Sequence, residues 1–136
     1  MDKLNKFFYK KKIFITGHTG FKGSWLTETL LLLGAKVVGF SKFDDKIFFY
    51  KKIVEHKKVK NVYGDVSDHK KLKQAINKHK PEIIFHLAAQ PLVIDGYKDP
   101  HKTFKSNCMG VINILDIAKG LKSLKSIIIV TSDKCY

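Results

Sequence analysis

Short apolar runs recur along the chain and alternate with longer amphipathic stretches. These runs are rich in β-branched and aromatic residues, which is typical of strands, and they occupy residues 12–16, 36–40, 61–63, 82–87 and 126–131. The last two contain EIIF and SIIIV, in which apolar residues follow one another without polar alternation. Such runs are typical of parallel strands that are covered on both faces of a sheet.

Three of the intervening stretches carry apolar residues at helical spacing. In the first, the stripe comprises Trp25, Leu26, Thr29, Leu30 and Leu33, and Gly34 is expected to end the helix. In the second, Ser67 is expected to cap a helix that runs to Lys78 and buries Leu72, Ala75 and Ile76. In the third, over residues 101–119, the stripe comprises Phe104, Cys108, Val111, Leu115 and Ala118.

Two stretches are less regular. Residues 44–56 are aromatic and lysine-rich, which we interpret as a short helix, and residues 90–100 are interpreted as a loop with a proline near each end. The alternation of strands and helices predicts an α/β fold: a doubly wound parallel sheet of the Rossmann type, with strand order 3-2-1-4-5. A chain of 136 residues is expected to form a single domain.

The composition narrows the function classes. The formal net charge is +14, from 26 basic residues, all of them lysine, and 12 acidic residues. Nucleic-acid binding is the first alternative for such a charge, but the lysines are scattered and no arginine is present for bidentate guanine contacts. We therefore expect no nucleic-acid partner, and no membrane partner because no apolar run is long enough to span a bilayer. The two cysteines and six histidines show no metal-ligand spacing, which predicts no metal site and fits a cytoplasmic protein.

A glycine-rich loop between the first strand and the first helix is the clearest candidate site. Its residues are Gly17, His18, Thr19, Gly20, Phe21, Lys22 and Gly23. In a dinucleotide-binding loop the first glycine permits a tight turn, the second lets the backbone approach a pyrophosphate, and the third lets the helix pack closely on the strand. The start of the helix then offers N–H groups and a positive dipole to the phosphates. His18 is expected to reach a phosphate or the sugar.

The identity of the dinucleotide is less sharply indicated. Asp44 and Asp45 lie near the distance at which an acidic residue binds the ribose 2′-hydroxyl of NAD, although they follow the apparent end of the second strand. Ser41 or Lys42 would instead suit the 2′-phosphate of NADP. We therefore favour NAD and leave NADP open. Asp65, after the third strand, is interpreted as an acceptor for the adenine amino group or as an ordinary turn aspartate.

Five stretches taken together resemble a known family. In order they are ITGHTGFKGSWL, GDVSD, PEIIFHLAAQPLV, SNCMGVINIL and VTSDKCY. They are similar to the CDP-glucose 4,6-dehydratases of the extended short-chain dehydrogenase/reductase superfamily, over about residues 12–136. The resemblance implies an NAD-dependent lyase that oxidises the sugar of CDP-glucose at C4, eliminates water across C5 and C6, and re-reduces C6. The product is CDP-4-dehydro-6-deoxyglucose, a precursor of polysaccharide deoxysugars.

The resemblance also implies roles for individual residues. Cofactor contacts are implied at the glycine loop and at Asp65, Val66, Leu87, Ala88, Ala89, Gln90 and Asn107, the last of which supports the active site. Catalytic roles are implied for Ser132 at the C4 oxygen, Asp133 as the acid for the departing C6 hydroxyl, and Lys134 at the C5 proton. From the residues alone, a strand-end turn is the alternative for Ser132 and Asp133.

The YxxxK pair of the superfamily and the sugar-binding part are not found in the sequence. We therefore expect an incomplete NAD(P)-binding domain over residues 1–136 that does not turn over CDP-glucose by itself, while the full-length form is expected to be a homo-oligomer. Two alternatives stay open: a catalytically inactive dinucleotide-binding remnant, and half of another nucleotide-sugar epimerase or reductase.

Overall fold

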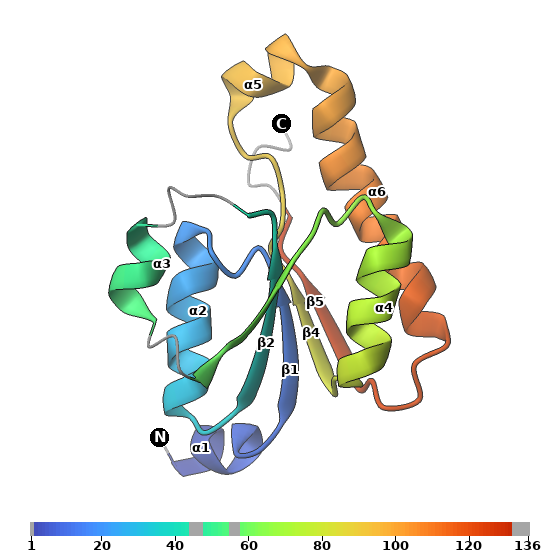
Figure 1. The fold of residues 1–136 in the computed structure, drawn as a ribbon. Coiled ribbons are helices and arrows are strands. Elements are labelled where there is room, and N and C mark those ends of the chain that lie inside the picture. Colours follow the sequence, from blue (N-terminus) through green and yellow to red (C-terminus); the bar gives the residue numbers. More distant parts are fainter. Residues whose placement is uncertain (1, 44–47, 55–57, 132–136) are drawn as a thin grey trace.

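The computed structural model describes residues 2–43, 48–54 and 58–131. Its centre is a five-stranded sheet in the order β3-β2-β1-β4-β5, and every neighbouring pair is parallel (Figure 1). The strands are β1 (Lys12–Thr16), β2 (Lys36–Ser41), β3 (Lys60–Tyr63), β4 (Ile83–His86) and β5 (Ser126–Ile129). The predicted fold class and strand order are confirmed.

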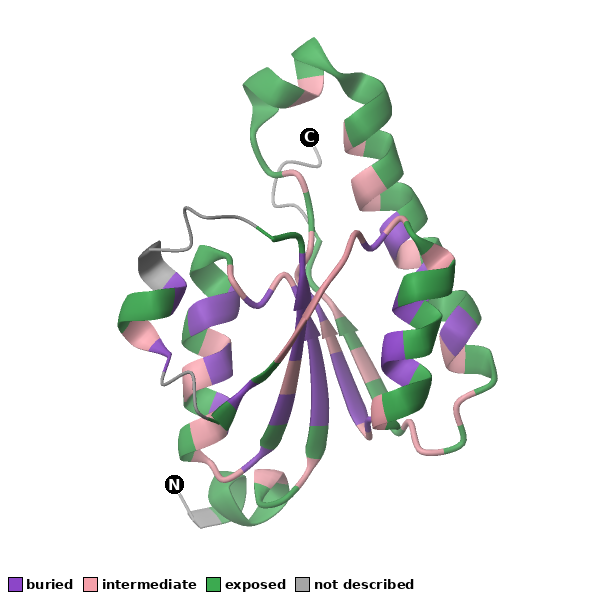
Figure 2. Cartoon of the chain, in the orientation of Figure 1, coloured by how far each residue is buried: buried purple, intermediate pink, exposed green. Residues whose placement is uncertain are grey.

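Helices cover both faces of the sheet. In chain order they are α1 (Asp2–Phe8), α2 (Phe21–Leu32), α3 (Phe48–Ile53), α4 (His69–His79), α5 (Val93–Lys98) and α6 (Pro100–Lys119). Figure 1 shows α2 and α3 on one face and α4 and α6 on the other. Because side chains alternate along β1, Ile13 and Ile15 join the core cluster that contains Leu30 of α2, whereas Phe14 joins the cluster that contains Ile114 of α6. Strands β1 and β4 are therefore buried on both sides, as the apolar run of β4 predicted, whereas the same prediction is wrong for the edge strand β5, in which Ile128 is 37% exposed (Figure 2).

The predicted inner face of α2 is confirmed only in part, at Leu26 and Leu30, and that of α6 is wrong. The buried residues of α2 are Gly23, Ser24, Thr27 and Leu30, whereas Trp25 is 54% exposed. The buried residues of α6 are Gly110, Asn113, Ile114 and Ile117, whereas Phe104, Cys108 and Leu115 of the predicted stripe are exposed. Both helices place a glycine where they approach the rest of the fold. A Cβ on Gly110 would lie 2.9 Å from Val66 Cγ2, so close approach decides the face.

Several element boundaries also differ from the expectation. The cap of α4 is Asp68 and not Ser67, since the Asp68 carboxylate accepts a 3.0 Å hydrogen bond from the Lys71 N–H. The predicted loop over residues 90–100 contains the short helix α5, and the charged amino-terminal stretch forms α1. The short helix expected within residues 44–56 is present as α3.

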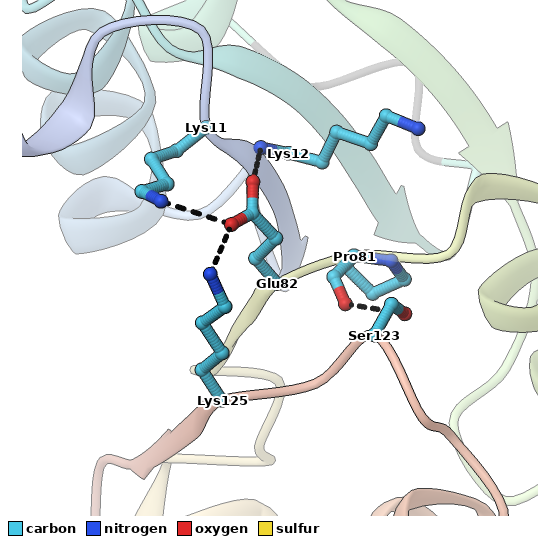
Figure 3. Close-up of polar contacts among 6 residues, drawn as sticks. All are labelled: Lys11, Lys12, Pro81, Glu82, Ser123 and Lys125. Atoms are coloured by element: carbon cyan, nitrogen blue, oxygen red, sulfur yellow. Dashed lines mark hydrogen bonds and ion pairs between the residues drawn. The ribbon is translucent and has the colours of Figure 1, made fainter.

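The amino ends of three strands are tied together by Glu82. Its carboxylate accepts hydrogen bonds from the ammonium groups of Lys11 at 2.9 Å and Lys125 at 3.1 Å (Figure 3). Its backbone N–H donates to Lys12 O at 2.8 Å, and its carbonyl accepts from the Lys125 N–H at 2.8 Å. This cluster joins the amino ends of β1, β4 and β5, at the end of the sheet opposite to the glycine loop.

Within the described residues, no helix is both long enough and apolar enough to cross a bilayer, and no three potential metal ligands gather.

Candidate functional site

The glycine loop lies where the strand order of the sheet reverses. It follows the carboxyl end of β1, which pairs with β2 on one side and with β4 on the other. The chain passes from β1 to β2 and β3 on one side of the sheet and then crosses to β4 and β5 on the other, so the loops after β1 and β4 meet where the strand order reverses. In open parallel sheets this topological switch point is where ligands bind.

Gly17 brings the loop against the end of β4. Its φ of +72° is a left-handed conformation that favours glycine, and a Cβ there would lie 2.7 Å from Ala88 N and 2.9 Å from the Leu87 carbonyl carbon. The Gly17 N–H donates to Phe40 O of β2 at 2.8 Å. The fold thus brings together the glycine loop and two of the predicted strand-end residues, Leu87 and Ala88.

Gly23 lets α2 begin directly beneath the loop. A Cβ on Gly23 would lie 2.1 Å from Gly17 O, whereas one on Gly20 would meet only that same oxygen at 3.3 Å. Gly20 is the N-cap of α2 and provides no capping side chain. A helix start leaves N–H groups without intrahelical partners and carries a partial positive charge. The start of α2 therefore has the chemistry of an anion site, and Thr19, Phe21 and Lys22 surround it on the surface.

The His18 side chain does not point where the sequence suggested. The imidazole is fully buried, its Nε2 lies 2.8 Å from Asn61 Oδ1 on β3, and its ring packs edge-on against Tyr50 of α3. A Cβ on Gly39 would lie 2.2 Å from His18 Cδ2, so the ring occupies the space that this glycine leaves. His18 therefore cannot reach a phosphate with its side chain in this arrangement, and the expected contact is corrected.

Asn107 shapes the segment after β4. Its Oδ1 accepts a 2.7 Å hydrogen bond from the Gln90 N–H, and its Nδ2 donates to Gln90 O at 3.1 Å. This two-point contact fixes the Gln90 backbone to α6, beside the exposed Ala89. The geometry agrees with a supporting role for Asn107, in which it orients the chain that leaves β4.

A buried polar pair beneath the loop was missed by sequence reasoning. Thr16 Oγ1 lies 2.7 Å from His86 Nδ1 and accepts a 3.2 Å hydrogen bond from the Ala88 N–H. Burial lowers the pKa of His86 from 6.5 to about 4, so the imidazole is neutral near pH 7. The only sequence signal was a polar residue at the end of each of two apolar strands.

Asp65 is held in a turn and paired with Lys42. Burial alone would raise the Asp65 pKa, but the hydrogen bond from the Ser67 N–H at 2.9 Å and the Lys42 ammonium at 2.9 Å outweigh it, so the pKa lies below its usual value. Lys42 is thus engaged by an acidic residue, while Ser41 is buried. The following residue, Val66, is also buried, and its carbonyl accepts a 2.9 Å hydrogen bond from Asn113 Nδ2.

Two groups of predicted site residues lie outside the described residues: the candidate ribose ligands Asp44 and Asp45, and the candidate catalytic residues Ser132, Asp133 and Lys134.

Comparisons with known proteins show which family and relatives the chain is similar to. Residues 14–136 match the family described as GDP-mannose 4,6 dehydratase. The chain is 41% identical over 131 residues to CDP-glucose 4,6-dehydratase of Salmonella typhimurium; the match covers 96% of this chain and 36% of that relative. It is 33% identical over 116 residues to GDP-mannose 4,6-dehydratase of Vibrio cholerae, covering 79% of this chain and 31% of the relative. The chain thus spans less than two fifths of the length of each of these two curated relatives.

Solved structures show the same fold. Epimerase Mth375 of Methanothermobacter thermautotrophicus superposes with a TM-score of 0.86 at 26% identity, over 98% of this chain and 38% of that one. The Bordetella bronchiseptica enzyme WbmH, solved in complex with NAD⁺, superposes with a TM-score of 0.70 at 33% identity, over 82% of this chain and 36% of that one.

Proposed function

We propose, from the premise that this chain belongs to the GDP-mannose 4,6 dehydratase family, that residues 1–136 are the NAD-binding domain of a nucleotide-sugar dehydratase acting on CDP-glucose. The observation that carries the proposal is the glycine loop at the topological switch point. There Gly17 and Gly23 let β4 and α2 approach the loop backbone more closely than a Cβ would allow, and no side chain among the described residues caps α2.

These residues fit a dinucleotide. The N–H groups at the start of α2 would hold the diphosphate, Asp65 and Val66 would meet the adenine, and the segment from Leu87 to Gln90 would line the nicotinamide half. NAD is favoured over NADP because Lys42, a candidate for a 2′-phosphate, is already paired with Asp65. NADP remains the alternative cofactor.

The reaction would convert CDP-glucose to CDP-4-dehydro-6-deoxyglucose. When bound, NAD supplies the hydride acceptor for C4 and the hydride donor for C6. Within the chain, Ser132 would hydrogen-bond the C4 oxygen, Asp133 would protonate the departing C6 hydroxyl, and Lys134 would act on the C5 proton. Asn107 would position the chain that leaves β4 through its two hydrogen bonds to Gln90.

A pair of isosteric substitutions tests the diphosphate site. Gly20 has an extended backbone that L-residues adopt, and aspartate and asparagine are both good N-caps, so G20D and G20N should preserve or stabilise α2. A carboxylate at this position repels a diphosphate, whereas the amide is neutral. We expect calorimetry to show NAD⁺ affinity lowered in G20N and lowered by about a further tenfold in G20D. Equal affinities for wild type and G20D would contradict the diphosphate site.

Substrate choice needs a separate assay. The chain, with NAD⁺, is incubated with CDP-glucose, GDP-mannose and UDP-glucose, and binding and product are followed by NMR. Selective binding of CDP-glucose would support the proposed substrate. Preference for UDP-glucose would favour the alternative of an epimerase part. NAD⁺ binding without sugar binding or product is expected both of an incomplete dehydratase domain and of a dinucleotide-binding remnant, because the sugar-binding part is not found in residues 1–136.

We also propose a cytoplasmic location and a homo-oligomeric full-length form. The exposed second apolar face of α6, which includes Phe104, Ile112 and Leu115, supports association because it would be covered in an assembly. Light scattering that showed a monomer at high concentration, unchanged by I112K, would count against this part of the proposal.

A further inference from the structure

His18 links the glycine loop to two other elements through one side-chain oxygen, Oδ1 of Asn61. Asn61 Oδ1 accepts a 2.7 Å hydrogen bond from the Tyr50 hydroxyl and lies 2.8 Å from His18 Nε2. Tyr50 is 1% exposed and His18 is fully buried, while Asn61 is half-buried, so both contacts are largely shielded from water. Through Asn61, the loop after β1 is connected to β3 and to α3.

The chemistry of this oxygen determines the state of the histidine. A carboxamide oxygen only accepts hydrogen bonds, so His18 Nε2 must carry a proton. Burial lowers the His18 pKa and outweighs the opposing effects of the Asn61 side chain and of the Phe40 backbone, so the ring is neutral near pH 7 and, with its proton on Nε2, leaves Nδ1 unprotonated. Nδ1 is buried and has no hydrogen-bond partner among the described residues. The ring therefore serves as a neutral donor to Asn61 and not as a group that exchanges protons with a ligand.

The position of α3 depends on the same contacts. Tyr50 and Val54 bury α3 against the core, and the His18 and Tyr50 rings lie 5.1 Å apart at 89°. Moving the loop would displace the ring from Gly39, break the contact with Asn61 and remove the packing partner of Tyr50. The loop and α3 cannot shift independently without losing buried hydrogen bonds, each of which is costly to leave unmade.

We propose that His18 is a positioning residue that couples the glycine loop to α3, so that a dinucleotide bound at the loop also stabilises the docked position of α3. This inference rests on the proposed dinucleotide site. It assigns His18 an indirect role, through Asn61 and Tyr50, in place of direct contact with the phosphates.

Hydrogen exchange on the full chain measures this coupling directly. The reporter is the Val54 amide, which donates to Tyr50 O at 2.9 Å at the end of α3. We expect saturating NAD⁺ to slow its exchange by about tenfold, within the usual range of coupling between two sites. In H18F, which keeps a ring but removes the donor, NAD⁺ should still bind and the Val54 protection should be lost. H18Q restores a donor and should recover much of the protection.

Two further variants separate coupling from a general loss of stability. Y50F removes the hydroxyl donor at a residue outside the proposed binding surface, and it should also uncouple Val54 if H18F fails to fold. S123A removes the 3.0 Å hydrogen bond to Pro81 O at the opposite end of the sheet, and it should leave the NAD⁺-induced protection unchanged.

The outcomes distinguish this inference from the proposed function. Absence of NAD⁺ binding to the wild-type chain would overturn both. Binding without protection of Val54, or protection that persists in both H18F and Y50F at saturating NAD⁺, would overturn the coupling alone.

Discussion

The buried imidazole of His86 predicts a specific loss of stability in mild acid. His86 is 2% exposed, and burial lowers its pKa from 6.5 to about 4. Below the ordinary pKa the unfolded chain binds a proton that the folded chain does not bind until the pH approaches its own lower pKa. The free energy of unfolding therefore falls as the pH falls between these two values, and the loss stops below the lower one.

The magnitude follows from the two pKa values. At about 1.4 kcal/mol per pH unit, the interval from 6.5 to about 4 corresponds to a loss of about 3 kcal/mol. This is a large part of the stability of a domain of this size. The effect belongs to the folded environment of one residue, in which Thr16 Oγ1 lies 2.7 Å from Nδ1 and Gly110 of α6 packs near Cε1.

Urea unfolding followed by far-ultraviolet circular dichroism, between about pH 7.5 and pH 4, measures this loss. H86Q should be less stable than wild type near neutrality but should lose less stability on acidification, so the two curves converge. His18 and His79, whose pKa values are also lowered, contribute equally to both proteins and cancel in the difference. H101Q changes an exposed histidine and should follow wild type. If wild type and H86Q lose stability in parallel, the reasoning is refuted.

Three other substitutions have outcomes that the structure fixes. Lys11 and Lys125 lower the Glu82 pKa from 4.5 to about 2. The stabilisation that they give is therefore present above pH 4.5 and is lost as the pH falls towards about 2. E82Q should lower the free energy of unfolding by about 1 kcal/mol near neutrality, and by less in high salt. G23A forces a Cβ to within 2.1 Å of Gly17 O. It should lower the free energy of unfolding by about 2 kcal/mol and should also abolish NAD⁺ binding. D68A removes the cap of α4 and should cost about 1 kcal/mol in urea unfolding.

Matched controls make these results decisive. G96A places a Cβ 3.7 Å from Thr103 Oγ1, an ordinary contact, and should retain NAD⁺ binding where G23A does not. D68A is measured by urea unfolding alone, because the Asp68 N–H donates to Asp65 O at 3.0 Å, next to the proposed adenine contact. Equal NAD⁺ affinity in G23A and wild type would show that the loop tolerates displacement of α2, and an E82Q effect that is insensitive to salt would argue against ion pairing.

The sequence by itself determined the strands, the sheet order and the position of the glycine loop. The alternation of apolar runs with helices predicted a parallel sheet, and the order 3-2-1-4-5 was expected because it is the order typical of the Rossmann-type fold. The loop was recognisable because Gly17, Gly20 and Gly23 lie between a strand and a helix, where the spacing has a local physical meaning. The predicted partnership of Asn107 with the active site came from resemblance and stays a prediction, whereas its contact with the Gln90 backbone is visible only in the tertiary structure.

Only the tertiary structure decided which helix faces are buried and where His18 points. Helix α6 carries apolar residues on two faces, and periodicity alone does not choose between the one with Phe104 and the one with Ile114. Gly110 decides which face of α6 is buried, because it packs closely against Val66 and His86, which are distant from it in sequence. His18 is likewise drawn inward by Gly39, Tyr50 and Asn61. Local patterns do not encode such contacts, because they depend on residues that become neighbours only after the sheet has formed.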